Sequence, residues 1–226
     1  MKNKNIIVVQ NLLRCLDLES LKNSEVVANL VRAFGIVQWG PDAFGEDEKF
    51  KNASADMAGI YQTPNQIAEA LVYLSQFEIN SFLEIGTFQG GNFIFMSEYL
   101  RRFNPGIKCL GIDPTEFLND EIRAIIETEI FLSFKTITSD QLIDQEEFDL
   151  VFIDGDHTAE WVKRDFENVG QYAKICMIHD IQEWSCQDIG EFWTTIKGKK
   201  AIEFLDYTSE KPSQGIGIII KKKDKD

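Results

Sequence analysis

The segment Ser81–Gly91 constrains the fold of this chain more than any other. An apolar run enters a glycine turn directly after an acidic residue, Glu84, and an amphipathic segment follows. This succession predicts a β-strand, a tight loop and the N-terminus of a helix. Such a junction places free backbone N–H groups and the positive end of a helix at the carboxyl edge of a sheet. Ligands of open α/β sheets bind at that edge.

The rest of the chain continues the alternation of strands and helices. Strands are predicted at 81–85, 107–112, 134–138, 148–153 and 175–178, and helices at about 92–102, 119–128, 158–172 and 189–196. Two final strands, 201–205 and 215–220, have no helix between them and are expected to be antiparallel neighbours. The predicted fold is therefore α/β: a doubly wound, seven-stranded, mostly parallel sheet of the Rossmann-like kind, with helices on both faces.

An N-terminal helical extension precedes the sheet. Apolar spacing predicts two helices within 6–34, and Thr63 and Pro64 are suited to the start of a third. The irregular stretch 35–58 carries aromatic residues that either pack locally or form a substrate wall. We expect three parts: 1–58, helices and a loop acting as a cap, lid or oligomer contact; 59–221, the ligand-binding domain; and 222–226, a charged tail.

The net charge and the cysteine content limit the classes of binding partner and the cellular compartment that we expect. A net charge of −14 argues against nucleic acid or an anionic membrane as the main partner. The apolar run at 6–9 is too short for a membrane span or a signal peptide. The four cysteines show no metal-binding spacing, so we expect reduced thiols and a cytoplasmic protein.

Polar residues follow strand after strand at the predicted carboxyl edge. They are Glu84, Asp113, Ser139, Asp140, Asp154, His157, His179 and Asp180. Because parallel strands end at one edge, these side chains are expected to converge. This convergence is the strongest functional argument that the residues provide.

The glycine loop indicates the ligand. It matches neither the GxGxxG fingerprint nor a P-loop. Glu84, two residues before Gly86, favours a cationic or hydroxyl-rich ligand, and Asp113 is placed to accept hydrogen bonds from a ribose diol. A ligand with a ribose, an amine and no phosphate is S-adenosylmethionine. By themselves, Gly86 and Gly90 would indicate only a tight turn.

Both histidines of the chain lie beside carboxylates. Asp154, His179 and Asp180 could bind a divalent cation; carboxylates favour Mg²⁺, Ca²⁺ or Mn²⁺, and imidazole favours Mn²⁺, Fe²⁺ or Zn²⁺. His157, with an unperturbed pKa of about 6.5, is suited to removing a hydroxyl proton. A metal would lower the pKa of that hydroxyl and hold it in line with a methyl group.

These motifs resemble those of a known family. They are Gln62-Thr-Pro-Asn, Phe82-Leu-Glu-Ile-Gly-Thr-Phe-Gln-Gly-Gly, Gly111-Ile-Asp-Pro, Phe148-Asp-Leu-Val-Phe-Ile-Asp-Gly-Asp-His and Met177-Ile-His-Asp. Over residues 57–221 the chain is similar to class I S-adenosylmethionine-dependent methyltransferases. Within that group it resembles the cephalosporin hydroxylase-like and metal-dependent sugar O-methyltransferases (Methyltransferase 24-like).

The resemblance implies a role for each matched residue. It implies that Glu84, Gly86 and Gly90 line the methionine part of the cofactor, that Asp113 holds the ribose, and that Ser139 and Asp140 flank the adenine, with Gln62, Thr87 and Asp154 completing the set. Asp154, His179 and Asp180 would hold Mg²⁺ or Mn²⁺, and His157 would be the general base. One departure is His179, since the family usually has Glu or Asp there.

The expected function is metal-assisted O-methylation of a hydroxylated small molecule, a sugar or a natural product. Two alternatives stay open: a non-catalytic S-adenosylmethionine-binding partner subunit, and a metal-dependent hydroxylase. We expect the substrate wall to come from 35–58 and 182–188, where Trp184 is either part of that wall or a hydrophobic plug. The sequence leaves open whether the chain forms a homo-oligomer.

Overall fold

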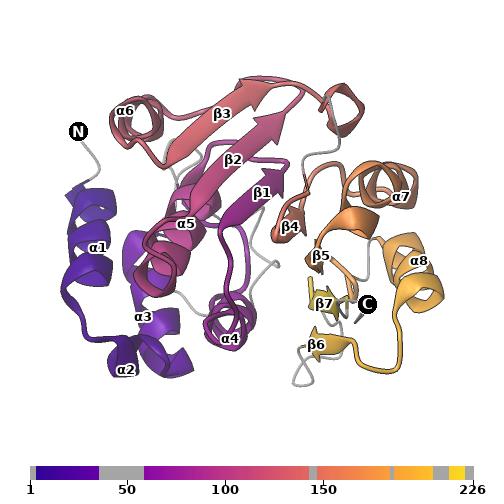
Figure 1. Cartoon of the computed structure of the whole chain (residues 1–226), viewed down its shortest axis with the longest axis horizontal. Coiled ribbons are helices and arrows are strands. Elements are labelled where there is room, and N and C mark those ends of the chain that lie inside the picture. The colour runs from indigo at the N-terminus through magenta and orange to yellow at the C-terminus, as the bar shows by residue number, and fades with distance from the viewer. Residues whose placement is uncertain (1–3, 36–58, 143–146, 184–185, 206–213, 222–226) are drawn as a thin grey trace.

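A seven-stranded sheet runs through the centre of the molecule (Figure 1). The computed structural model describes residues 4–35, 59–142, 147–183, 186–205 and 214–221. The strand order is β3-β2-β1-β4-β5-β7-β6. The strands are β1 (Ser81–Ile85), β2 (Lys108–Asp113), β3 (Leu132–Thr136), β4 (Leu150–Ile153), β5 (Ile175–His179), β6 (Ile202–Phe204) and β7 (Ile216–Ile220). The predicted doubly wound α/β sheet is confirmed.

Strand directions follow the prediction. The first five strands are parallel, and β7 pairs antiparallel with both β6 and β5. The antiparallel neighbours β6 and β7 were expected, whereas the insertion of β7 between β5 and β6 was not. This insertion brings Gln214, two residues before β7, beside the segment that follows β5.

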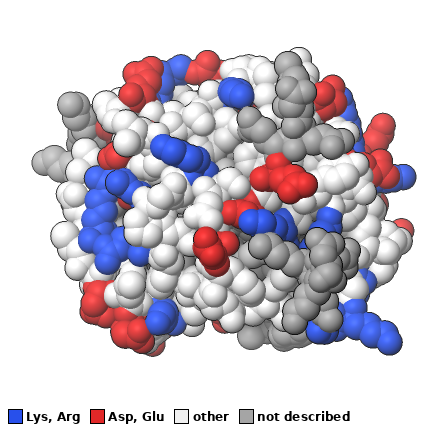
Figure 2. Space-filling view, viewed as in Figure 1, with Lys and Arg blue, Asp and Glu red and all other residues white. Residues whose placement is uncertain are grey.

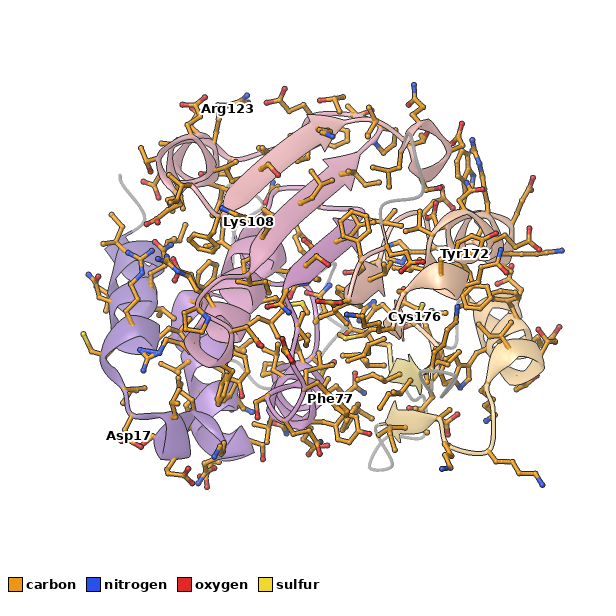
Figure 3. All side chains as sticks on the ribbon, viewed as in Figure 1. Asp17, Phe77, Lys108, Arg123, Tyr172 and Cys176 are labelled. Atoms are coloured by element: carbon orange, nitrogen blue, oxygen red, sulfur yellow. The ribbon has the colours of Figure 1, made fainter. Side chains whose placement is uncertain are left out.

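Helices cover both faces of the sheet. They are α1 (Lys4–Cys15), α2 (Leu18–Leu21), α3 (Ser24–Phe34), α4 (Pro64–Leu74), α5 (Gly91–Phe103), α6 (Asp120–Thr128), α7 (Ala159–Asn168) and α8 (Gln187–Ile196). Neighbouring strand residues point to opposite faces. Phe82 and Phe152 belong to the hydrophobic core on the side of α1–α6, and Leu83 and Val151 to the core with α7 and α8. Side chains crowd both layers (Figure 3).

Several element boundaries differ from the predicted ones. The strand predicted at 148–153 begins at Leu150, and the helix predicted at 189–196 begins at Gln187. The N-terminal region has three helices rather than two, because Asp17 caps the extra short helix α2 through the backbone N–H of Ser20. β3 begins two residues earlier than predicted. The helix predicted at 158–172 ends at Asn168 and is followed by a 3₁₀ turn, Gly170–Tyr172.

The N-terminal helices pack on the sheet domain. Apolar residues of α1 and α3 share one core with α4 and α5. The Arg14 guanidinium pairs with Glu98 of α5, and the Tyr99 hydroxyl donates to the carbonyl of Leu21. The predicted loop 35–58 lies almost wholly outside the described residues.

The surface charges, the cysteines and the helix lengths bear on the expectations drawn from the composition. Acidic and basic side chains are interspersed on the face in Figure 2. All four cysteines are free, and Cys109 and Cys176 are buried. Among the described residues, no helix is both long and apolar enough to cross a membrane.

Candidate active site

The polar residues predicted at the strand ends do gather at one edge of the sheet. β4 lies between β1 and β5, so the end of β4 brings Asp154 between Glu84 of β1 and His179 of β5. Gln62, just before α4, donates its side-chain N–H to Asp154 Oδ2. Contacts join five of the predicted residues into one cluster: Gln62, Asp154, His157, His179 and Asp180.

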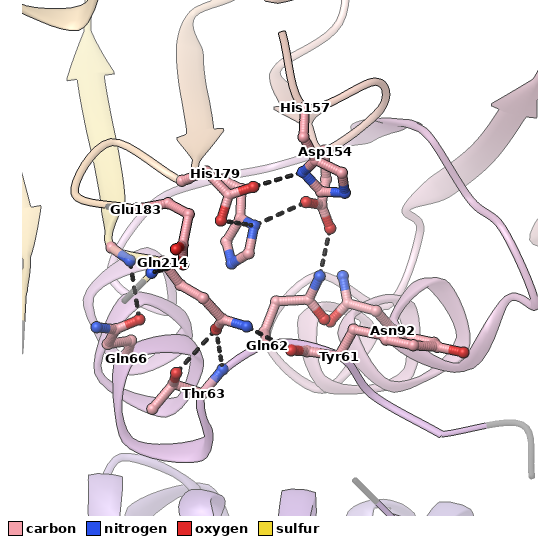
Figure 4. Close-up of polar contacts among 12 residues, drawn as sticks. Tyr61, Gln62, Thr63, Gln66, Asn92, Asp154, His157, His179, Glu183 and Gln214 are labelled. Atoms are coloured by element: carbon pink, nitrogen blue, oxygen red, sulfur yellow. Dashed lines mark hydrogen bonds and ion pairs between the residues drawn. The ribbon is translucent and has the colours of Figure 1, made fainter. Parts of the chain in front are cut away.

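Two histidines and two carboxylates form a chain of contacts (Figure 4). His179 Nδ1 lies 2.9 Å from Asp154 Oδ1 and 3.1 Å from Asp180 Oδ1. It sits between these oxygens without a well-aligned hydrogen bond to either, so the contacts are ionic. His157 Nδ1 lies 2.5 Å from Asp180 Oδ2. Asp180 thus joins the two imidazoles.

Burial differs along this chain of contacts. The side chains of His179, Asp154 and Asp180 are 5%, 8% and 7% exposed, whereas that of His157 is 55% exposed. His157 is thus the member of the group that a molecule from solvent can reach.

The paired charges shift the pKa values of His179, Asp180 and His157. Burial by itself would lower the pKa of His179, but Asp180 and Asp154 outweigh it and raise this pKa well above the usual value. Burial would raise the pKa of Asp180, yet its contacts with His179 and His157 hold it far below the usual range. The contact with Asp180 raises the pKa of His157.

The three predicted metal ligands do not fit a bound cation as they are arranged. Where a metal would lie between Asp154 and Asp180, the ring nitrogen of His179 lies instead. The described part of the chain contains no group of three His, Cys, Asp or Glu side chains that could hold a metal ion. Mg²⁺ or Mn²⁺ binding therefore stays a prediction that the donor set does not favour.

Glu84 is a buried carboxylate that pairs with no cation among the residues that the structure describes. It is 1% exposed, and its Oε1 accepts a hydrogen bond of 2.6 Å from Asn92 Nδ2. Its Oε2 has no hydrogen-bond partner within the described residues. Burial, together with the charges of Asp154 and Asp113, raises the pKa of Glu84 well above its usual value. Glu98, equally buried, differs because Arg14 pairs with it.

Further acceptors near Glu84 are open. Gln62 Oε1 and Asn92 Oδ1 are also buried and lack a hydrogen-bond partner among the described residues. Buried polar groups are nearly always hydrogen-bonded, so such a group of open acceptors is unusual. Its chemistry suits a ligand that brings several N–H donors and a positive charge.

The glycines of the loop are explained by close packing. Gly86 has φ +89°, and a Cβ there would lie 2.2 Å from the carbonyl oxygen of Asp154. Gly90 has φ +86°, and its Cβ would lie 2.4 Å from a side-chain carbon of Ile122. Thr87 is buried, and its hydroxyl donates to the carbonyl of Ile112. These residues shape the loop and bring its backbone to the sheet edge.

The other predicted cofactor contacts lie farther along the edge. Asp113 accepts hydrogen bonds from the backbone N–H groups of Phe88 and Thr115, one on each oxygen. A carboxylate oxygen has two lone pairs, so each oxygen can still accept another donor.

Ser139 and Asp140 differ in burial and in the residues they contact. The buried hydroxyl of Ser139 donates to Asp165 Oδ1 at 2.6 Å and accepts from Asn168 Nδ2. Asp140 is exposed and pairs with Arg164.

Sequence reasoning missed several members of this neighbourhood. Gln214 Oε1 accepts hydrogen bonds from both the backbone N–H and the hydroxyl of Thr63, so the Thr63 side chain does not cap α4. Asn92 and Asp165 were also missed. Only the position of Asn92, in the first turn of the helix after the glycine loop, offered a signal. Trp184 lies outside the described residues.

Comparisons with known proteins agree with this fold. A family model described as a methyltransferase domain matches residues 83–181. No curated protein sequence is significantly similar to the chain.

Similar solved structures include three methyltransferases. An O-methyltransferase of Bacillus cereus in complex with S-adenosylhomocysteine has a TM-score of 0.57 and 18% identity, covering 98% of this chain and 100% of that one. The S-adenosylhomocysteine-bound methyltransferase PaMTH1 of Podospora anserina has 0.55 and 13%, covering 88% and 95%. The O-methyltransferase TomG of Streptomyces achromogenes, involved in tomaymycin synthesis and bound to S-adenosylmethionine, has 0.53 and 14%, covering 72% and 82%.

Identities this low establish a shared fold, and the family match adds the type of domain. The matched residues run from β1 to the end of β5, which includes Glu84, Asp154, His157 and His179. The strand order and this match together show that residues 83–181 match a methyltransferase domain and that the chain shares the fold of S-adenosylmethionine-dependent methyltransferases.

Proposed function

We propose that this chain methylates a hydroxyl oxygen of a small molecule, with His157 as general base. The observation that carries the proposal is a buried Glu84, with no cation paired to it among the described residues, on the same sheet edge as the half-exposed His157. The first feature suits a positively charged methyl donor, and the second suits the removal of a proton from an acceptor.

The open acceptors suit the ammonium group of S-adenosylmethionine. Glu84 Oε2, Gln62 Oε1 and Asn92 Oδ1 are buried and have no hydrogen-bond partner in the described part of the chain, and an ammonium group brings three N–H donors. Asp113 is the proposed acceptor for the ribose hydroxyls, with Ser139 and Asp140 beside the adenine. Gly86, Thr87, Gly90 and Asp154 would act by shaping the loop that faces the cofactor.

His157 is positioned by Asp180. Since Nδ1 lies against the Asp180 carboxylate, Nε2 is the nitrogen left to accept a proton from the acceptor hydroxyl. Asp180 then stabilises the imidazolium that forms, as the carboxylate of a catalytic triad does. S-adenosylmethionine supplies the methyl group; its C–S bond breaks as the new C–O bond forms, and the electron pair returns to sulfur.

The acceptor is proposed to be a sugar or another hydroxylated natural product. TomG, which is involved in tomaymycin synthesis, supports this class. No step of the proposal uses a metal, because the side chains at the predicted metal position do not fit one.

The test has two parts. Isothermal titration with S-adenosylmethionine should show one binding site, and absence of binding at millimolar ligand would refute the proposal. A panel of hydroxylated sugars and phenols, followed by mass spectrometry, should then reveal a methylated product. Binding without any product from a broad panel would favour the non-catalytic partner subunit.

A further inference from the structure

A buried imidazole lies where two carboxylates could otherwise share a cation. The structure places His179 Nδ1 2.9 Å from Asp154 Oδ1 and 3.1 Å from Asp180 Oδ1 (Figure 4). A cation such as Mg²⁺ in this position would lie about 2.0–2.6 Å from the same two oxygens. The ring nitrogen of His179 therefore takes the position between the two carboxylates that such a cation would need.

The remaining carboxylate oxygens are also occupied. Asp154 Oδ2 accepts from Gln62, and Asp180 Oδ2 lies against His157. All four oxygens of the pair therefore have a nitrogen of this chain within 3.1 Å. A cation would have to displace at least two of these contacts, and in three of the four both side chains are buried.

The backbone supports the same arrangement. Asp180 has φ 60°, a left-handed conformation that Asp adopts more readily than most residues with a side chain. Its carboxylate faces both histidines, one with each oxygen. A neighbour that holds Asp180 in this orientation therefore also holds His157.

We propose that His179 takes the place of a divalent cation in this site, so that the site is metal-independent. His179 is a positioning residue: it joins Asp154 to Asp180, and Asp180 in turn orients His157. The consequence for catalysis rests on the proposed methyl transfer, whereas the consequence for metal binding does not.

Metal binding tests the inference without any activity. The chelator-treated protein is titrated with Mn²⁺ by calorimetry and by electron paramagnetic resonance, with and without S-adenosylmethionine. The wild type should bind no Mn²⁺ at up to millimolar concentration. His179→Glu provides three carboxylates and should bind Mn²⁺ at least tenfold more tightly, with a melting temperature that rises on Mn²⁺ addition. His179→Gln, which is neutral, is the matched control and should gain no binding.

The outcomes separate clearly. One Mn²⁺ bound to the wild type with submillimolar affinity overturns the inference, as does a His179→Glu variant that binds no better than His179→Gln. If His179→Glu is unstable without metal, purification in Mn²⁺ keeps the comparison possible, and His179→Asp provides a second carboxylate variant. Where turnover is measurable, the wild-type rate should not change on chelation; failure to bind S-adenosylmethionine would refute the proposed function but not this inference.

Discussion

The substitution Glu84→Gln tests whether the Glu84 carboxylate binds a ligand or stabilises the fold. Glu84 is 1% exposed and has one oxygen without a partner in the described structure. A hydrogen bond to a charged group contributes about 1.5–3 kcal/mol net. Since 1.4 kcal/mol corresponds to a tenfold change in affinity, we expect the Kd for S-adenosylmethionine to rise about 10- to 100-fold.

The same variant should not weaken the fold. Because the pKa of Glu84 is raised in the folded protein, ionisation of Glu84 opposes folding as pH rises through that pKa. Glu84→Gln removes this cost. Its free energy of unfolding, measured by urea titration, should therefore exceed that of the wild type at pH 8, with a difference that shrinks toward pH 4.

Glu98→Gln is the matched control. Glu98 is as buried as Glu84 but pairs with Arg14 and accepts from Gln10. Its loss should lower the free energy of unfolding by about 1.5–3 kcal/mol and leave cofactor affinity unchanged. If Glu84→Gln retains wild-type affinity, or if both variants weaken binding equally, the role proposed for Glu84 is wrong.

Three further changes test the site and its frame. His157→Gln should lower kcat by about 10²–10⁴-fold and leave the cofactor affinity unchanged. Since the neutral imidazole is the base, wild-type kcat should rise with pH through the raised pKa of His157. A kcat that does not depend on pH would contradict this role. Gly86→Ala should lower the melting temperature, because its Cβ would lie 2.2 Å from the Asp154 carbonyl oxygen, whereas Gly106→Ala, which meets nothing within 4 Å, should stay close to wild type. Burial raises the pKa of Asp165 from 3.8 to about 6, so the free energy of unfolding falls as pH rises through this range. Asp165→Asn avoids this loss. By urea titration, its free energy of unfolding should exceed that of the wild type by up to about 3 kcal/mol at pH 8 and by almost nothing at pH 4.

Local sequence determined the strand–helix alternation and hence the sheet. Ser81–Ile85 is a strand with both boundaries as predicted, because its apolar residues are buried on both faces. The boundary of β3 was missed by two residues because that edge strand is mostly exposed and carries little hydrophobic signal. The rule that parallel strands end at one edge also predicted that Asp154, His179 and Asp180 would meet.

Tertiary structure alone decided which atoms these residues contact. Gln62 reaches Asp154 across 92 positions, and Arg14 reaches Glu98 across 84. Periodicity and turn signals report the local backbone, whereas a donor is matched to an acceptor by the packing of distant segments. The sequence therefore predicted a cluster of acids and histidines. Only the fold determined that no described cation pairs with Glu84 and that His179 Nδ1 lies between two carboxylates.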